Sequence, residues 1–160
     1  MNIYELKKED EKAWDEYVFN HSNSTFYHQL GWKNVVEKSY RHKPYYLIAK
    51  ENNKIKGVLP LFLMESKIFG KKLVSVPYAP YSGALADNEY IESALVEKAE
   101  KIMKMCDADY LELRNLIEKQ NLTYSTNYSY INFVIKMDLS LDIIWENLRR
   151  DKKKGIKKAK

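Results

Sequence analysis

The segment Ser75–Asp87, SVPYAPYSGALAD, has the residue types best suited to binding a ligand. It lies between a predicted strand and the most regular helical pattern in the chain, and a helix N-terminus offers unpaired amides and a favourable dipole to an anion. One glycine, two prolines and the acids Asp87 and Glu89 argue against a phosphate at this junction. We therefore expect either a rigid, tyrosine-lined wall of a substrate site or a purely structural loop. Its candidate substrate-binding residues are Tyr78, Tyr81, Ser82 and Gly83.

A second candidate is the charged pair Glu112 and Arg114 in YLELRN. Residues two apart on a strand project from the same face, so both side chains lie beside Tyr110. Charges on an interior strand need partners or a wet cleft. Two interpretations remain open: the pair neutralises itself or a neighbouring strand, or Arg114 binds a phosphate or carboxylate through its planar fork.

The third group, His28, Trp32 and Lys33, lies at the start of a predicted helix. Helical spacing favours Trp32 as a core residue and Lys33 as an ordinary solvated charge. The spacing of His28 from the other two histidines fits neither a catalytic triad nor a metal site, so we expect no bound metal. The chain also lacks a P-loop and a GxGxxG motif.

The last thirteen residues, 148–160, hold eight Lys or Arg and one Asp, a balance of +7. Because the whole chain carries +5, the first 147 residues carry −2, and a basic end is attached to a body that is not basic. The simpler interpretation is a charged helical face. The functional one is contact with anions such as transfer RNA or acidic lipid. The candidates for that contact are Arg149, Arg150, Lys153 and Lys157.

A run of predicted strands positions the central candidates. They are Tyr45–Lys50, Ile55–Met64 and Lys71–Val76. Asn52-Asn53 predicts a tight hairpin, because Asn tolerates the positive φ that such turns need, and Ser66–Gly70 predicts a second one. Pro60 removes a backbone donor, which indicates an edge, a bulge or a splayed position inside the second strand. We expect three adjacent antiparallel strands.

Helical and strand patterns flank this run. We expect a strand at Asn2–Leu6, a helix capped by Asp10, helices at Leu30–Tyr40 and Glu89–Cys106, strands at Tyr110–Asn115 and Ile131–Met137, a loop at Glu118–Tyr130, and a terminal helix capped by Ser140. The order β-α-α-β-β-β-α-β-β-α predicts a mixed α/β (α+β) fold.

Several of these stretches resemble Fem-type acyltransferases, and more narrowly the FemAB-related proteins associated with exopolysaccharide loci. The similar segments are HKPYYLIAKENNKIKGVLPLFLMESKIFGKKLVSVPYAPYSGALAD, DADYLELRN, TFYHQLGW and LRRDKKKGIKKAK. The resemblance implies a GNAT-like fold, with a largely antiparallel sheet flanked by helices. It further implies that the region of Trp32 and Lys33 borders a substrate groove.

In that family an acyl or aminoacyl group passes to an amine, and the chain is about twice as long, with two GNAT-like domains. The expectation is therefore a first GNAT-like domain at 1–140 and a basic helix at 141–160 that leads into a second domain. The expected partner is a cell-wall or polysaccharide precursor. The acyl donor is an aminoacyl-tRNA or an acyl-CoA, with no resident cofactor. No general base stands out, so catalysis is expected to rest on positioning and on backbone donors to an oxyanion.

Two other classes stay open: a non-catalytic docking module, and a one-domain CoA-dependent N-acetyltransferase. Acetyl-CoA enzymes of the GNAT type place the pyrophosphate at the junction that Ser75–Asp87 occupies here, and the acids there disfavour the second class. A surface left by an absent second domain would allow self-association.

Composition limits the broad class of protein to which this chain can belong. At 160 residues, with 45% hydrophobic and 31% charged residues, the chain suits one globular domain, and it is rich in tyrosine, with 13. The lone Cys106 excludes an intrachain disulfide and a cysteine-based zinc cluster, and we expect it to be buried and inert. No run approaches the roughly 20 apolar residues of a membrane span, and the N-terminus has no apolar secretory segment. The expectation is a cytoplasmic location, either free or peripheral at the inner face of the membrane.

Overall fold

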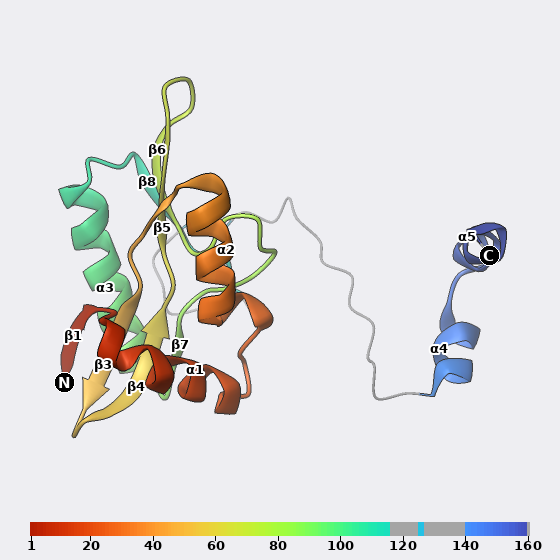
Figure 1. Cartoon of the computed structure of the whole chain (residues 1–160), viewed down its shortest axis with the longest axis horizontal. Coiled ribbons are helices and arrows are strands. Elements are labelled where there is room, and N and C mark those ends of the chain that lie inside the picture. Colours follow the sequence, from red (N-terminus) through yellow and green to blue (C-terminus); the bar gives the residue numbers. More distant parts are fainter. Residues whose placement is uncertain (116–124, 127–139, 160) are drawn as a thin grey trace. The chain divides into compact units, whose positions relative to one another are not determined.

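The computed structural model describes residues 1–115, 125–126 and 140–159. The chain divides into two compact units, Met1–Thr123 and Tyr124–Lys160 (Figure 1). The predicted strand Ile131–Met137 and nearly all of the predicted loop Glu118–Tyr130 lie outside the described residues.

Two four-stranded sheets form the centre of the first unit. One has the order β1 (Asn2–Glu5), β3 (Leu47–Glu51), β4 (Lys54–Leu59) and β7 (Leu85–Ala86), with every neighbouring pair antiparallel. The other has the order β2 (Lys43–Pro44), β5 (Phe62–Ser66), β6 (Gly70–Val74) and β8 (Tyr110–Glu112). In the second sheet β6 and β8 are parallel, and the other pairs are antiparallel. The largely antiparallel α/β class predicted from sequence is confirmed.

Pro60 marks the passage from one sheet to the other. The sequence predicts a single strand at Ile55–Met64, but β4 ends at Leu59 and β5 begins at Phe62. Proline cannot donate to a strand ladder, so the chain leaves the first sheet at this residue. Of the edge, bulge or splayed position expected at Pro60, the structure has the splayed position. The expectation of three adjacent strands is corrected, because β3 and β4 belong to one sheet and β5 and β6 to the other.

Both predicted hairpin turns are present. Asn52 and Asn53 have φ of 47° and 61°, the left-handed pair that a two-residue turn between β3 and β4 requires. Gly70 has φ of 73° at the end of the turn between β5 and β6.

Helices cover both faces of the sheets (Figure 1). They are α1 (Glu11–Asn20), α2 (Leu30–Tyr40) and α3 (Glu89–Met105), and they match the three predicted helices closely. Successive side chains of β3 point to opposite faces of the sheet, so the core has two parts. Ile48 packs with residues of α1 and α2, whereas Leu47 and Ala49 pack with residues of α3.

The prediction that Asp10 caps the first helix is wrong. Asp10 precedes α1, but its carboxylate makes no hydrogen bond to the amides of the first turn. Instead it accepts a 2.6 Å hydrogen bond from Lys50 Nζ on β3, and the residue is buried. A charged partner stabilises a buried carboxylate more than a backbone amide does, so the ion pair prevails.

The second unit contains α4 (Leu141–Asn147) and α5 (Arg150–Ala159). Ser140 Oγ accepts a hydrogen bond from the Ile143 amide, so the predicted cap is confirmed. The described part of the chain contains no helix with the length and apolar character needed to cross a membrane.

A glycine in β4 permits close packing of α3. A Cβ at Gly57 would lie 2.8 Å from Ile91 Cγ2 and 3.0 Å from Leu95 Cδ1. Gly57→Ala is therefore expected to lower the free energy of unfolding by about 1–3 kcal/mol through overpacking, measured by urea denaturation. The control is Gly31→Ala in α2, where a Cβ meets nothing within 4 Å and helix propensity should raise stability by about 0.5–1 kcal/mol. Equal effects at the two sites would contradict the packing described here.

Candidate functional site

The segment from Ser75 to Ala86, called the 75–86 loop, ends in the short strand β7 and is held by hydrogen bonds at several points. Ser75 donates its amide to the Glu112 carbonyl at 2.9 Å, and its Oγ accepts from the Arg114 amide at 2.8 Å. Ser82 donates its amide to the Arg114 carbonyl at 2.7 Å and its hydroxyl to the Ser75 carbonyl at 2.8 Å. Both serines are buried. The loop therefore closes over the end of β8.

The Arg114 side chain is paired within the protein. Its Nε lies 2.6 Å from Glu112 Oε1, and its Nη1 donates to the Ala79 carbonyl at 2.9 Å. The ion pair is one of the two alternatives open from sequence. The guanidinium connects β8 to the loop, which gives it a role in positioning the loop.

Two residues of the loop have a backbone conformation that side chains rarely adopt. Val76 has φ of 52° and Tyr78 φ of 62°. For the β-branched Val76 this is a genuine outlier, and strain of this kind concentrates at functional sites. The conformation leaves the Tyr78 ring half-exposed, stacked 4.2 Å from the Tyr40 ring, with its hydroxyl 3.1 Å from His42 Nε2.

Two histidines hold the second half of the loop. His28 ends a short 3-10 helix, Phe26–His28, and its Nδ1 accepts from the Thr25 amide at 3.1 Å. Its Nε2 must therefore carry the proton, which it donates to the Gly83 carbonyl at 3.0 Å. His21 makes similar contacts: Nδ1 accepts from the Asn23 amide, and Nε2 lies 3.5 Å from the Ala86 carbonyl. Burial lowers the pKa of His28, so the ring is neutral at pH 7.

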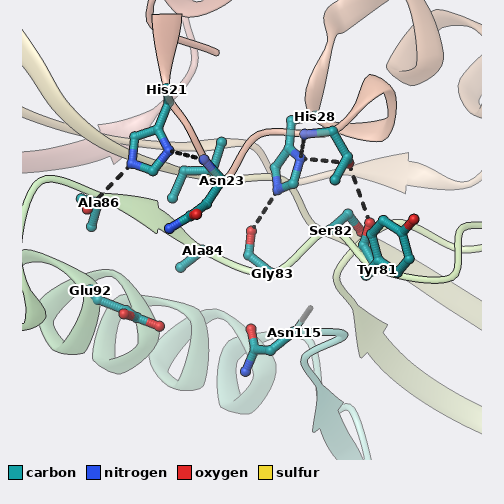
Figure 2. Close-up of a pocket in the computed structure, with 12 residues that line it drawn as sticks. His21, Asn23, His28, Tyr81, Ser82, Gly83, Ala84, Ala86, Glu92 and Asn115 are labelled. Atoms are coloured by element: carbon teal, nitrogen blue, oxygen red, sulfur yellow. Dashed lines mark hydrogen bonds between the residues drawn. The ribbon is translucent and has the colours of Figure 1, made fainter. Parts of the chain in front are cut away.

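A pocket of about 60 Å³ lies along this half of the loop (Figure 2). The loop segment runs between the two histidines on one side and Glu92 and Asn115 on the other. The pocket is lined by His21, Asn23, Thr25, His28, Tyr81, Ser82, Gly83, Ala84, Leu85, Ala86, Glu92 and Asn115. Gly83 lies against Asn115, and a Cβ at this position would require the Asn115 side chain to move.

The N-terminus of α3 is occupied by the protein's own groups. Asn88 caps it by accepting from the Ile91 amide at 3.0 Å. Asp87, immediately before the cap, accepts from Lys56 Nζ at 2.7 Å and from the Tyr17 hydroxyl at 3.0 Å. Burial opposes ionisation of Asp87, but these two hydrogen bonds outweigh it and hold the pKa of the carboxyl below its usual value. A carboxylate therefore stands where the helix dipole would otherwise favour an external anion.

The structure brings together some of the predicted site residues. Tyr81, Ser82 and Gly83 line the pocket, and Arg114 holds the loop that carries them. Tyr78 belongs to the separate aromatic stack with Tyr40 and His42.

Trp32 and Lys33 are not among the residues lining the pocket. The Trp32 ring packs edge-on against Phe26 and Tyr27, and its buried Nε1 has no hydrogen-bond partner. Lys33 pairs with Glu37 at 3.1 Å, one helical turn away.

The basic candidates lie in the second unit. Arg149 Nε is 3.3 Å from Asp151 Oδ1, and Lys153 Nζ donates to the Glu146 carbonyl at 3.0 Å. Arg150 and Lys157 lie on α5 and are exposed.

Sequence reasoning named His28 in the third candidate group but did not connect it with the 75–86 loop, and it assigned no role to His21, Asn23 or Asn115. No short-range motif connects His28 to Gly83, because the contact joins residues 55 positions apart. The available signal was local: Thr25 and His28 have capping-box spacing, with His in the position usually held by Glu or Gln. No group of three or more His, Cys, Asp or Glu within the described ranges is placed to hold a metal.

Cys106 is less enclosed than expected from sequence. Its side chain is partly buried, and its Sγ donates to the Tyr45 hydroxyl at 3.2 Å.

Comparison with known proteins defines the fold class. No family model and no curated protein match this sequence. Among solved structures, the aminoglycoside antibiotic 6'-N-acetyltransferase of Acinetobacter haemolyticus aligns at TM-score 0.57 and 13% identity, over 86% of this chain and 100% of that one. A GNAT family acetyltransferase of Staphylococcus aureus aligns at TM-score 0.55 and 13% identity, over 84% and 98%. The ribosomal-protein-alanine N-acetyltransferase of Brucella melitensis biovar Abortus aligns at TM-score 0.56 and 10% identity, over 85% and 99%.

The fold is therefore that of GNAT acetyltransferases. Identities this low establish the fold alone. The crystal structure of FemX aligns with 68% of this chain and 25% of that chain, at 19% identity and a TM-score of 0.46, which is too low to carry an argument.

Proposed function

We propose that this chain is the first GNAT-like domain of a Fem-type acyl or aminoacyl transferase, acting on an amine of a cell-wall or envelope polysaccharide precursor. The observation that carries the proposal is the closed N-terminus of α3. Asp87 and Asn88 stand at the junction where acetyl-CoA enzymes of this fold hold the pyrophosphate, and Glu89 and Glu92 follow in the first turn. This concentration of carboxylates opposes a phosphate. The domain then supplies the acceptor side of the reaction, and the activated acyl group is held elsewhere.

The pocket beside the 75–86 loop is the proposed acceptor site. A volume of about 60 Å³ exceeds the 10–15 Å³ that one water needs, so the pocket has room for a small polar group. Such a space suits an amine at the end of a short alkyl chain. Asn23, Glu92 and Asn115 line the pocket, and carboxylate and side-chain amide oxygens can accept hydrogen bonds from an ammonium group.

The role proposed for this domain in catalysis is to position the acceptor amine. The hydrogen bonds of Ser75, Ser82, Arg114 and His28 fix the loop, so an amine in the pocket loses its orientational freedom before reaction. The exposed lysines and arginines of α5 are the proposed contact for an anionic donor such as transfer RNA, and that contact should weaken with salt.

A second candidate, a one-domain CoA-dependent N-acetyltransferase, is favoured by one observation. This chain aligns with 98–100% of the length of the three acetyltransferases named above. In that case the α3 junction would have to accept the pyrophosphate of acetyl-CoA despite Asp87.

Calorimetric titration separates these functions. The chain is titrated with a soluble muramyl peptide precursor that carries a free amine, with the same peptide acetylated on that amine, and with acetyl-CoA. We expect binding of the free amine, at least tenfold weaker binding of the acetylated peptide, and no binding of acetyl-CoA.

Each other outcome refutes the proposal in a defined way. Saturable binding of acetyl-CoA would overturn the interpretation of the α3 junction and favour the one-domain enzyme. Equal binding of both peptides would exclude the pocket as the amine site. Binding of none of the three ligands would leave a non-catalytic docking module as the better interpretation.

A further inference from the structure

The turn between β5 and β6 carries two large apolar side chains fully in solvent. Ile68 and Phe69 are each 84% exposed, the highest exposure among the large hydrophobic residues of the described chain. Figure 1 shows that this hairpin extends beyond the rest of the first unit. Exposed apolar side chains gathered at a projecting tip indicate an interaction surface more strongly than scattered ones do.

The hairpin is built to keep its tip extended. Ser66 Oγ accepts hydrogen bonds from the amides of Ile68 and Phe69, each at 3.2 Å, which fixes the turn. The β5–β6 ladder is in register from Phe62 to Ser66, so the arm is a regular two-stranded ribbon.

The arm is attached to the body of the domain close to its turn, where β6 begins at Gly70. Asp109 accepts from the Lys71 amide at 2.8 Å, and Gly70 leaves room for that carboxylate. The apolar tip is thus held away from the core by specific contacts.

A lysine lies beside the apolar tip. Residues 65–72 contain three lysines and one glutamate. Lys71 lies 3.5 Å from Glu65, and Lys72 lies 4.0 Å from Glu112, so these two lysines are paired with carboxylates. Lys67 is exposed immediately beside Ile68 and forms no ion pair with another described residue. An apolar tip with an exposed lysine beside it complements an anionic surface with an apolar interior, as acidic phospholipids present.

We propose that the 65–72 hairpin docks the protein on an anionic lipid bilayer, with Ile68 and Phe69 entering the interfacial layer and Lys67 contacting lipid headgroups. A protein partner is disfavoured by the shape of the surface, because two side chains on a narrow projection provide little of the area that a stable protein interface buries. The inference is independent of the acceptor site, since it uses no residue of the pocket.

Flotation with lipid vesicles tests the proposal. The native chain should associate with vesicles of phosphatidylcholine and phosphatidylglycerol at 3:1, and at least tenfold less with phosphatidylcholine alone. The double variant Ile68→Ser, Phe69→Ser should partition at least fivefold less to the acidic vesicles. Phe19 on α1 is 82% exposed, so Phe19→Ser is the matched control and should bind as the native chain does. Circular dichroism verifies the fold of each variant.

A tryptophan at the hairpin tip distinguishes insertion of the tip into the bilayer from electrostatic binding of the vesicles by the basic residues of α5. Phe69→Trp should show a blue shift and quenching by lipids brominated in the acyl chain, and Phe19→Trp should show neither. Native-like binding by the double variant, or no quenching of the Trp at position 69, would overturn the proposal. Loss of a concentration-dependent dimer in the double variant, without loss of vesicle binding, would instead assign the tip to self-association.

Discussion

Replacing Trp14 with alanine is expected to lower the free energy of unfolding by about 3–5 kcal/mol, the largest effect of any change considered. Trp14 on α1 is fully buried, and its ring centroid lies 5.0 Å from that of Tyr46 in the loop between β2 and β3. Its Nε1 donates to the His28 carbonyl at 2.8 Å, so the same residue holds the connection to α2 and the start of the pocket wall. Urea denaturation followed by far-ultraviolet circular dichroism measures the change.

Two controls divide the expected loss into its parts. Trp14→Phe keeps most of the buried ring but removes the indole donor, and should cost about 1–3 kcal/mol, partly because the His28 carbonyl loses its partner. Phe19→Ala alters an exposed ring on the same helix and should stay within about 0.5 kcal/mol of the native protein. A loss below about 1 kcal/mol for Trp14→Ala would contradict the core described here.

The helices and turns could be predicted from sequence because their signals are short-range. The 3.6-residue period of Ile91, Leu95, Ala99 and Ile102 predicts α3, and the same residues form the buried face of that helix. Asn52-Asn53 predicts a turn because few residues tolerate the φ found there.

The arrangement of the strands was less accessible from sequence. Pro60 indicated an interruption, but which sheet each side joins is decided by partners far along the chain. β7 was missed because two residues, Leu85 and Ala86, are too few for a period-two pattern, and only their pairing with β4 makes them a strand.

Sequence reasoning selected the 75–86 loop as a candidate site, but it did not identify most of the residues that hold this loop in place. A loop rich in Tyr, Pro and Ser before a regular helix indicated the place, and the acids near Asp87 indicated its charge. The residues that hold the loop came from elsewhere: Thr25 and His28 from the segment before α2, and Lys56 from β4. Contacts of this kind depend on tertiary structure, and a single sequence carries no pattern for them. Asp10 illustrates the same limit, since its partner Lys50 is 40 residues away.

His28 should make the stability of the domain depend on pH. Its pKa is lowered chiefly by burial, the hydrogen bonds with Gly83 and Thr25 oppose the change, and the electrostatic interaction with His21 adds a smaller lowering. In the unfolded chain the group titrates near its ordinary value of about 6.5. Because the unfolded state then binds the proton more strongly, the contribution of His28 is complete above about pH 6.5 and is lost as the pH falls toward the lower folded value. Protonated Nδ1 can no longer accept from the Thr25 amide.

Substitution of His28 is expected to have the second large effect on the free energy of unfolding. His28→Ala should cost about 2–4 kcal/mol at pH 7, because it leaves a cavity and deprives the Thr25 amide and the Gly83 carbonyl of their partners. His28→Gln can replace the bond to Thr25 in the usual capping-box manner and should cost less than His28→Ala. Urea denaturation at pH 7 and pH 5 should show a smaller stability loss on acidification in both variants than in the native chain. The exposed-site variant Phe19→Ala should keep the native pH dependence. If His28→Gln also kept it, another group would have to be responsible, and the neutral His28 that joins the 25–28 turn to Gly83 would not be the acid-sensitive contact.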